Sequence, residues 1–246
     1  MRNIWIIARR EYKYYFTSPV AYIVAFFFML ILGLLFYINL RGAILQSMYQ
    51  AYAPGVQIAI SPMVTLLIFV LPAVTMRTIA DETRTGTMEL LLTAPVKDWE
   101  LVVGKWFGAF LFMLTLLAMT WVFPIILNFL VKPGIDQGIL ITGYLGLLLM
   151  VASLLAIGVF ISSLVNNQLV AFFITLLIIL ALWFISQLAS MSSGLGSQVL
   201  GFFGYIDHFY SFYQGSIDLS DVVYYLSLTA LGLFLGTISV EMRRWR

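Results

Sequence analysis

Long stretches without a charged residue divide the chain into apolar segments joined by shorter polar ones. Residues 14–40, 42–76, 106–131, 137–206 and 222–240 contain no Asp, Glu, Lys or Arg. About 20 apolar residues cross a hydrocarbon core about 30 Å thick, so four of these runs can each hold one spanning helix and the longest can hold two. We therefore predict six spans, at about residues 20–40, 57–79, 103–130, 139–164, 169–189 and 221–240.

Six helical spans make this an all-α polytopic membrane protein, with residues 1–246 forming one transmembrane domain. The composition agrees, because 62% of the residues are hydrophobic and 10% are charged, against about 25% charged in a typical soluble domain. The chain has no cysteine and one histidine, which excludes disulfides, thiolate metal sites and a histidine-based ligand set. A net charge of +2 gives no nucleic-acid signature. We expect no metal, cofactor or nucleic-acid partner for this chain.

The basic residues are unevenly distributed around the predicted spans. Both termini fall on one side, together with the loop between the second and third spans. Because cytoplasmic segments are enriched in Lys and Arg, we predict that these three regions are cytoplasmic. Of the 13 basic residues, only Arg41 and Lys132 fall on the other side. The rest are Arg2, Arg9, Arg10, Lys13, Arg77, Arg84, Lys97, Lys105, Arg243, Arg244 and Arg246.

Residues 1–18 have the pattern of an amphipathic helix that ends before Pro19. Four basic residues share one sector of the helical wheel: Arg2, Arg9, Arg10 and Lys13. The opposite sector is apolar and holds Ile4, Ile7, Ala8 and Tyr15, with Glu11 as an exception among them. We predict an interfacial helix that lies along the inner headgroups.

Residues 190–220, between the fifth and sixth spans, are uncharged at first and rich in Ser and Gly. Their composition predicts a re-entrant or interfacial segment on the outer side. An aromatic cluster follows, suited to the headgroup level: Phe202, Phe203, Tyr205, Phe209, Tyr210, Phe212 and Tyr213. We expect His208, which lies among these rings, to be a solvated interfacial side chain.

Two sources of energy are disfavoured by residues that the chain does not contain. The centres of the predicted spans carry no ionisable side chain, whereas carriers driven by an ion gradient usually place such groups inside the membrane. Gly104-Lys105 is the only Gly-Lys pair, and no glycine precedes it at the spacing of a phosphate-binding loop. We therefore predict that this chain is not an enzyme and does not hydrolyse ATP.

The loop at residues 80–98 is the largest cytoplasmic feature of the predicted topology. Read as a helix up to Pro95, it places Met88, Leu91 and Leu92 on one face, and Glu82 and Glu89 border that face. An apolar ridge bordered by acids is typical of a helix that docks into a groove of a soluble partner. The alternative is an interfacial helix resting on lipid, which the anionic inner leaflet disfavours for acidic residues.

This loop also carries a family resemblance. The pattern Glu82-x-x-x-Gly86-Thr87-x-Glu89-x-Leu91, with Thr93-Ala94-Pro95-Val96, Trp99-Glu100 and Gly104-Lys105 after it, resembles the signature of the ABC-2 type permeases. These are the membrane subunits of one class of ATP-binding-cassette transporter. The resemblance extends over nearly the whole chain. Residues 71–77 and 162–168 look most like the gliding-motility permease branch.

The resemblance implies a permease that pairs with a second permease subunit, as a homodimer or heterodimer. Two separate cytoplasmic ABC ATPase subunits would bind at the loop, and ATP and Mg would bind on those partners. By matching positions, Glu82, Gly86, Thr87, Glu89 and Leu91 are candidates for transmitting motion. With the contacts of Met88 and Leu92, the candidate coupling set is Glu82, Gly86, Thr87, Met88, Glu89, Leu91 and Leu92.

The sequence therefore predicts export of an unidentified substrate across the plasma membrane of a prokaryote, which is the inner membrane where there are two. The multi-pass chain would contact lipid and couple ATP hydrolysis by its partners to this export. An alternative is a non-transporting membrane anchor or scaffold that recruits a cytoplasmic ATPase. A gradient-driven carrier is disfavoured by the uncharged span centres.

Overall fold

The structure, a computed structural model, describes residues 2–49, 54–87, 96–191 and 200–244, and these ranges contain helices and no strand. An all-α fold is thereby confirmed. The helices run in the order α1 (Arg2–Thr17), α2 (Pro19–Tyr49), α3 (Gln57–Thr75), α4 (Ala80–Thr85), α6 (Asp98–Met119), α7 (Val122–Leu130), α8 (Gln137–Leu164), α9 (Gln168–Met191), α11 (Tyr205–Gln214) and α12 (Leu219–Arg244).

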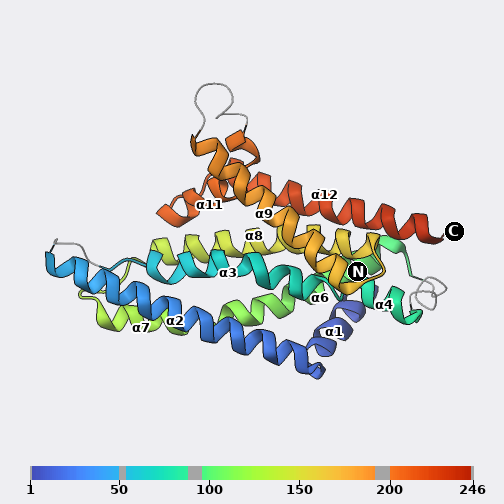
Figure 1. Cartoon of the computed structure of the whole chain (residues 1–246), viewed down its shortest axis with the longest axis horizontal. Coiled ribbons are helices and arrows are strands. Elements are labelled where there is room, and N and C mark those ends of the chain that lie inside the picture. The colour runs from blue at the N-terminus through green and yellow to red at the C-terminus, as the bar shows by residue number, and fades with distance from the viewer. Residues whose placement is uncertain (1, 50–53, 88–95, 192–199, 245–246) are drawn as a thin grey trace.

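Within the described ranges, six helical segments are long and apolar enough to cross a membrane. They are Ala21–Ser47, Gln57–Thr85, Asp98–Leu130, Gln137–Leu164, Gln168–Ala189 and Leu219–Arg243. Each coincides with one predicted span, so the number and order of the spans are confirmed. The helices run nearly side by side along the long axis of the molecule, except that α9 leans away at its C-terminal end (Figure 1).

The third span is not the single continuous helix that the sequence predicts. It consists of α6 and α7, which meet at Thr120 and Trp121. Pro124 explains the position of the break, because a proline at residue 124 has no N–H to donate to the carbonyl of Thr120 four residues earlier. The third span is therefore interrupted just before Pro124.

α8 is the central helix of the bundle, and 78% of its most apolar window is buried. Glycines on α8 let its neighbours approach closely. A β-carbon at Gly158 would lie 2.3 Å from the hydroxyl oxygen of Thr75 on α3, and one at Gly146 would lie 2.7 Å from the β-carbon of Phe212 on α11. These close approaches seat α3 and α11 on two sides of α8.

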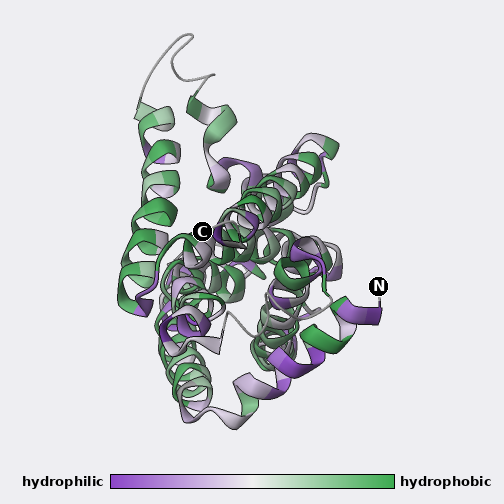
Figure 2. Cartoon of the chain, turned by 90° about the vertical axis from the view of Figure 1, so that its right-hand side faces the viewer, coloured by the Kyte–Doolittle hydropathy of each residue, from purple (hydrophilic) through white to green (hydrophobic). Residues whose placement is uncertain are grey.

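α2 and α9 form the least buried spans, with 22% of each apolar window inside the protein. Large apolar side chains such as Phe26, Ile38, Phe173 and Leu177 point outward from them. Figure 2, which looks at the end of the bundle that carries the termini, shows mostly apolar residues along the long helices and alternating hydrophilic and hydrophobic stretches along the helix that begins at N. Such all-round apolar helices are expected where lipid replaces water as the solvent.

α1 is a helix, as predicted, but its apolar face is covered by protein. Ile7, Ala8 and Tyr15 are buried, and α1 packs along α6. The interpretation that this face rests on lipid is therefore wrong, because the glycines of α6 leave a groove that α1 occupies. Contact of its basic face with headgroups remains a prediction.

The segment between the last two spans contains α11, which packs against α8, α9 and α12. Tyr205, Phe209 and Phe212 are buried, so three members of the predicted headgroup cluster belong to the protein core. The expectation of a solvated His208 is wrong as well. Its side chain is 13% exposed and lies against Asp221 of α12. The structure does not describe residues 192–199, where the uncharged part of this segment lies.

Both ends of the chain lie at the same end of the bundle as α4 (Figure 1). α7 and the beginning of α8 lie at the other end, with Lys132 between them. The segments predicted to be cytoplasmic are thus gathered together. The side of the membrane that this end faces stays a prediction.

Candidate functional site

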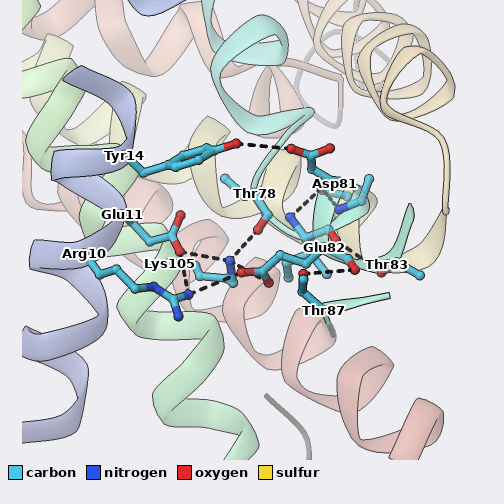
Figure 3. Close-up of polar contacts among 12 residues, drawn as sticks. Arg10, Glu11, Tyr14, Thr78, Asp81, Glu82, Thr83, Thr87 and Lys105 are labelled. Carbon is cyan, nitrogen blue, oxygen red and sulfur yellow. Dashed lines mark hydrogen bonds and ion pairs between the residues drawn. The ribbon is translucent and has the colours of Figure 1, made fainter. Parts of the chain in front are cut away.

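The candidate site is built around α4, the short helix at the start of the loop that the sequence singled out. Its residues Asp81, Glu82 and Thr83 bind side chains from helices that are distant in sequence. We call α4, the side chains that bind it and the residues paired with those side chains the α4 junction. Figure 3 shows that most of the polar groups converge between α1, α4 and α6.

Lys105 of α6 is at the centre of this convergence and is 1% exposed. Its ammonium nitrogen lies 2.8 Å from Oε2 of Glu82 and 3.1 Å from Oε1 of Glu11, and it donates to the carbonyl oxygen of Thr78 at 2.6 Å. The Glu82 contact has the geometry of an ion pair rather than of a well-aligned hydrogen bond. One buried cation therefore ties α1, α4 and α6 together (Figure 3).

The close packing of α1 on α6 brings Glu11 within reach of Lys105. A β-carbon at Gly104 would lie 2.8 Å from the β-carbon of Ile7, and one at Gly108 would lie 2.5 Å from the β-carbon of Glu11. Only glycine permits α1 to approach α6 this closely. Gly104 and Gly108 stand on either side of Lys105 along α6, so the same packing buries the charges.

Arg10 completes the charged cluster from the solvent side. Its guanidinium lies 3.0 Å from Oε1 of Glu11 and 3.3 Å from Oε1 of Glu82. Two cations thus face two carboxylates, which lowers the cost of burying Lys105 and its partners. A cleft of about 510 Å³ opens beside this cluster, and it is lined by residues that include Arg10, Glu11, Tyr14, Asp81, Glu82 and Thr87.

Asp81 joins α4 to α1 and α9. One of its carboxylate oxygens accepts a hydrogen bond from the hydroxyl of Tyr14 at 3.4 Å, and the other accepts from Arg84 at 3.2 Å and from the amide of Gln168. Arg77 lies 3.9 Å from Asp81 and donates to the hydroxyl of Ser18 at 2.9 Å. Asp81 therefore connects α4 with the start of α9 and with the end of α1.

α8 and α12 hold α4 from the remaining sides. The hydroxyl oxygen of Ser162 on α8 accepts hydrogen bonds from the backbone N–H groups of Ile79 and Ala80, at 3.1 and 3.0 Å. On α12, the guanidinium of Arg243 donates to Thr83 at 3.1 Å and to Asn166 at 3.0 Å. Ser162 satisfies two backbone donors at the beginning of a helix, where no partner exists within the helix itself.

Next to the junction, Tyr15 fastens α1 to α3. Its hydroxyl donates to the carbonyl oxygen of Val74 at 3.0 Å, and its ring stacks on Phe112 of α6 with 4.7 Å between centroids. Burial, the largest cause, raises the pKa of Tyr15 well above its ordinary range, with a further contribution from the charge of Glu11. The hydroxyl therefore keeps its proton and remains a donor.

α4 ends at Gly86, whose φ of 73° and ψ of 1° are left-handed. The sequence predicted one helix up to Pro95, and that continuous helix is wrong because a left-handed residue stops the helical hydrogen-bond pattern. Thr87 turns back beyond Gly86, and its hydroxyl oxygen lies 3.0 Å from that of Thr85. Gly86 thus introduces a bend into the loop that carries the candidate coupling residues.

Of the candidate coupling residues, the structure brings Glu82, Gly86 and Thr87 to one end of the protein. Glu82 is mostly buried against Lys105 and Arg10, with an 18% exposed side chain, so its basic partners lie within the chain. The other candidates, Met88, Glu89, Leu91 and Leu92, lie outside the described residues. Their proposed apolar face remains a prediction.

Sequence reasoning missed several members of the junction: Glu11, Lys105, Ser162, Gln168 and Arg243. A signal existed for Glu11, because it is an acid on the apolar sector of α1. A charge on a buried face needs a partner of opposite sign. Nothing in the sequence identified that partner as Lys105, which is 94 residues away.

The chemistry available at the junction is ion pairing and hydrogen bonding between helices. In the described part of the chain, no group of three or more His, Asp or Glu side chains is arranged to hold a metal ion. The junction connects α4 by polar contacts to α1, α6, α8, α9 and α12. A displacement of α4 therefore changes contacts to five helices at once.

Comparison with known proteins places the chain in a family. The family model for the ABC-2 family transporter protein matches residues 5–240. The match begins within α1 and ends within α12, so it reaches all six spans and includes every member of the α4 junction except Arg243. No individual curated protein matches the chain.

Proposed function

Because this chain belongs to the ABC-2 transporter family, we propose that it couples ATP hydrolysis on separate ATPase subunits to export of a substrate. Membership of the family makes the chain the membrane permease component of an ABC transporter, and not the ATPase. The proposal adds the route of coupling, in which the ATPase acts on the loop that begins with α4. ATP and Mg bind on the partner, and this chain needs no cofactor.

The observation that carries this proposal is the set of polar contacts made by α4. A six-residue helix on the surface of the bundle binds side chains from five longer helices. A partner that pushes or pulls on residues 86–95 would act directly on α4. The buried ion pairs of Lys105 are short, so they transmit a displacement better than a lipid-filled gap would.

The orientation proposed for the protein follows from its charge. The end that holds α4 and both termini also holds the basic residues of α1 and Arg243 of α12. The positive-inside tendency supports a cytoplasmic position for this end. The ATPase would then meet α4 from the cytoplasm of a prokaryotic cell, at its plasma membrane.

A second permease subunit is part of the proposed assembly, as a homodimer or heterodimer. The weakly buried α2 and α9 offer apolar surfaces to lipid or to such a subunit. Their chemistry is the same for both, since lipid tails and apolar side chains are similarly nonpolar. These surfaces therefore do not indicate the chemical class of the substrate.

The decisive experiment is reconstitution in lipid vesicles with an ABC ATPase subunit that co-purifies with the chain. We expect the permease to stimulate ATP turnover, and we expect Glu89→Lys in the loop to reduce both binding and stimulation. Lys132→Glu is the matched control, because it reverses an exposed charge at the opposite end. Unchanged binding and turnover in Glu89→Lys would remove the docking role of the loop.

The same reconstitution separates transport from scaffolding. A scaffold would bind the ATPase through the loop but leave its turnover unaffected by changes in the bundle. A permease predicts that Gly146→Ala, which disturbs the contact between α8 and α11 far from the loop, alters ATP turnover. Turnover that is independent of the bundle, with binding intact, would favour the non-transporting anchor.

A further inference from the structure

A second polar arrangement lies far from α4, at the end of the bundle where α11 meets the beginning of α12 (Figure 1). It contains His208, which is the one histidine of the chain. The proposed function does not use it. The contacts of His208 lead to a separate prediction about the protonation of its ring.

Both ring nitrogens of His208 face oxygen atoms. Nδ1 lies 2.7 Å from Oδ1 of Asp221 on α12, and Nε2 lies 3.1 Å from the carbonyl oxygen of Phe202. The ring also stacks on Tyr224 of α12, with 3.9 Å between centroids and 21° between planes. The imidazole is therefore held on three sides.

A neutral imidazole carries one N–H and can donate only one of these two hydrogen bonds. In either neutral tautomer, the other nitrogen would direct its lone pair at an oxygen lone pair about 3 Å away, which is repulsive. The doubly protonated imidazolium donates to both oxygens at once. With Asp221 ionised, the observed geometry is thus complete only for the charged form of His208.

Asp221 reinforces this conclusion. It is 6% exposed, and a buried carboxylate requires a cation or several donors. Among the described residues, His208 is the only basic side chain that pairs with it. Its second oxygen, Oδ2, is buried without a hydrogen-bond partner in the described ranges. A positive charge on His208 compensates a carboxylate that is otherwise poorly satisfied.

The other titratable groups near this pair are acids and tyrosines. α11 itself contributes Asp207, Tyr205, Tyr210 and Tyr213. α12 adds Tyr224 and Tyr225 beside Asp221, and Asp218 precedes that helix. Of the other helices packed against α11, α8 contributes only Tyr144, and α9 carries no titratable side chain. These helices therefore bring no other basic group to this end, so nothing on them opposes a charge on His208.

Two further hydrogen bonds show what His208 holds in place. The hydroxyl of Tyr224 donates to the carbonyl oxygen of Phe203 at 3.0 Å, and that of Tyr225 donates to the carbonyl oxygen of Tyr205 at 2.6 Å. Together with the His208 contacts, they fasten the chain just before and within the start of α11 to α12. Loss of one His208 contact would loosen the N-terminal end of α11.

We propose that His208 and Asp221 form a proton-operated clamp between α11 and α12. In the protonated state, His208 bridges Asp221 and the carbonyl of Phe202, and α11 is held on α12. A neutral imidazole can donate only one of these two hydrogen bonds. The clamp is therefore closed at low pH and opens as the pH rises and His208 loses its proton.

The first test uses the fact that the chain contains one histidine. In protein labelled with ¹⁵N-histidine and reconstituted in lipid, every histidine signal comes from His208. We expect imidazolium shifts for both nitrogens at the acid end of a titration from about pH 5 to 8, the range in which histidines titrate. Asp221→Asn removes the carboxylate that Nδ1 faces, so its titration should differ from that of the unmodified protein. A neutral tautomer throughout, or an identical titration in Asp221→Asn, would overturn the proposal.

The second test measures the clamp itself. The chain lacks cysteine, so cysteines at the exposed positions Tyr210 and Val223 can carry one spin label each, on α11 and α12. We expect a narrow distance distribution at acid pH that broadens as the pH rises. His208→Phe retains a ring for Tyr224 but no N–H, and should be broad at every pH. A distribution that does not change with pH in the unmodified His208 protein contradicts the clamp, even if the Phe variant fails to fold.

Discussion

Lys105 of α6 and Glu82 of α4 form an ion pair with 2.8 Å between the ammonium nitrogen and a carboxylate oxygen, and Lys105 is almost completely shielded from solvent. Glu11 of α1 shares the same lysine. Three helices that are separate in the sequence thus depend on one cation. Substitution of Lys105 therefore tests whether these ion pairs link the loop to the bundle.

Removal of the buried cation should destabilise the protein. Lys105→Met keeps most of the side-chain volume but leaves Glu11 and Glu82 close together without their shared partner. Breaking a buried ion pair from one side costs about 3–5 kcal/mol, and Arg10 offsets part of this. Thermal unfolding in detergent measures the loss.

Lys97→Met provides the control, since Lys97 is exposed and surface substitutions change stability by no more than about 0.5 kcal/mol. Neutralising Glu82 as well, in Lys105→Met with Glu82→Gln, should restore part of the loss. Equal unfolding temperatures for Lys105→Met and Lys97→Met would show that the buried cluster contributes nothing to stability.

Any side chain at residue 108 should destabilise the protein, because α1 packs directly on Gly108 of α6. Gly108→Ala places a β-carbon 2.5 Å from that of Glu11 and 3.0 Å from the carbonyl oxygen of Ala8, so α1 must move. We expect a loss of about 1–3 kcal/mol, typical of overpacking. Gly42→Ala is the matched change on α2, where no atom lies within 4 Å, and should stabilise by about 0.5–1 kcal/mol. A common sign for both variants in thermal unfolding would refute the close-packing explanation.

The hydroxyl of Ser162 should contribute more to the stability of the protein than the hydroxyl of Ser163. Ser162→Ala leaves the buried N–H groups of Ile79 and Ala80 without their acceptor, at a cost of about 1–3 kcal/mol. Ser163→Ala removes only a donation to the carbonyl of Phe160 on the same helix, and should be nearly neutral. Hydrogen exchange at Ile79 and Ala80 distinguishes the two, because protection there should fall only in Ser162→Ala.

Gly86 should be replaceable by asparagine more easily than by alanine. A β-carbon at Gly86 meets no atom within 4 Å, so the cost is purely conformational, about 1–2 kcal/mol for alanine in the left-handed region. Asparagine enters this region more readily. We expect Gly86→Ala to lower permease-stimulated ATP turnover, with Gly86→Asn closer to the unmodified protein. The reverse order would mean that backbone conformation at Gly86 does not limit coupling.

The fold was largely predictable because membrane insertion is governed by composition along the chain. Uncharged runs of sufficient length appear as the six spans, and the interruption between α6 and α7 lies just before Pro124. The predictions failed where contacts between helices compete with lipid. The apolar face of α1 and the rings of Phe209 and Phe212 suit a headgroup layer and a protein core equally well. They lie in the core because the glycines of α6 and α8 let α1 and α11 pack closely against these helices.

By itself, the sequence determined the class of the protein, the number and order of its spans, the family resemblance and the loop where coupling is expected. These follow from local length, hydropathy and motif spacing. Only the tertiary structure decided that Glu11, Glu82 and Lys105 share one buried site, and that His208 faces Asp221 and a carbonyl oxygen. The physical reason is that the free energy of a buried charge depends on the groups that surround it in space, and packing brings those groups from distant parts of the chain.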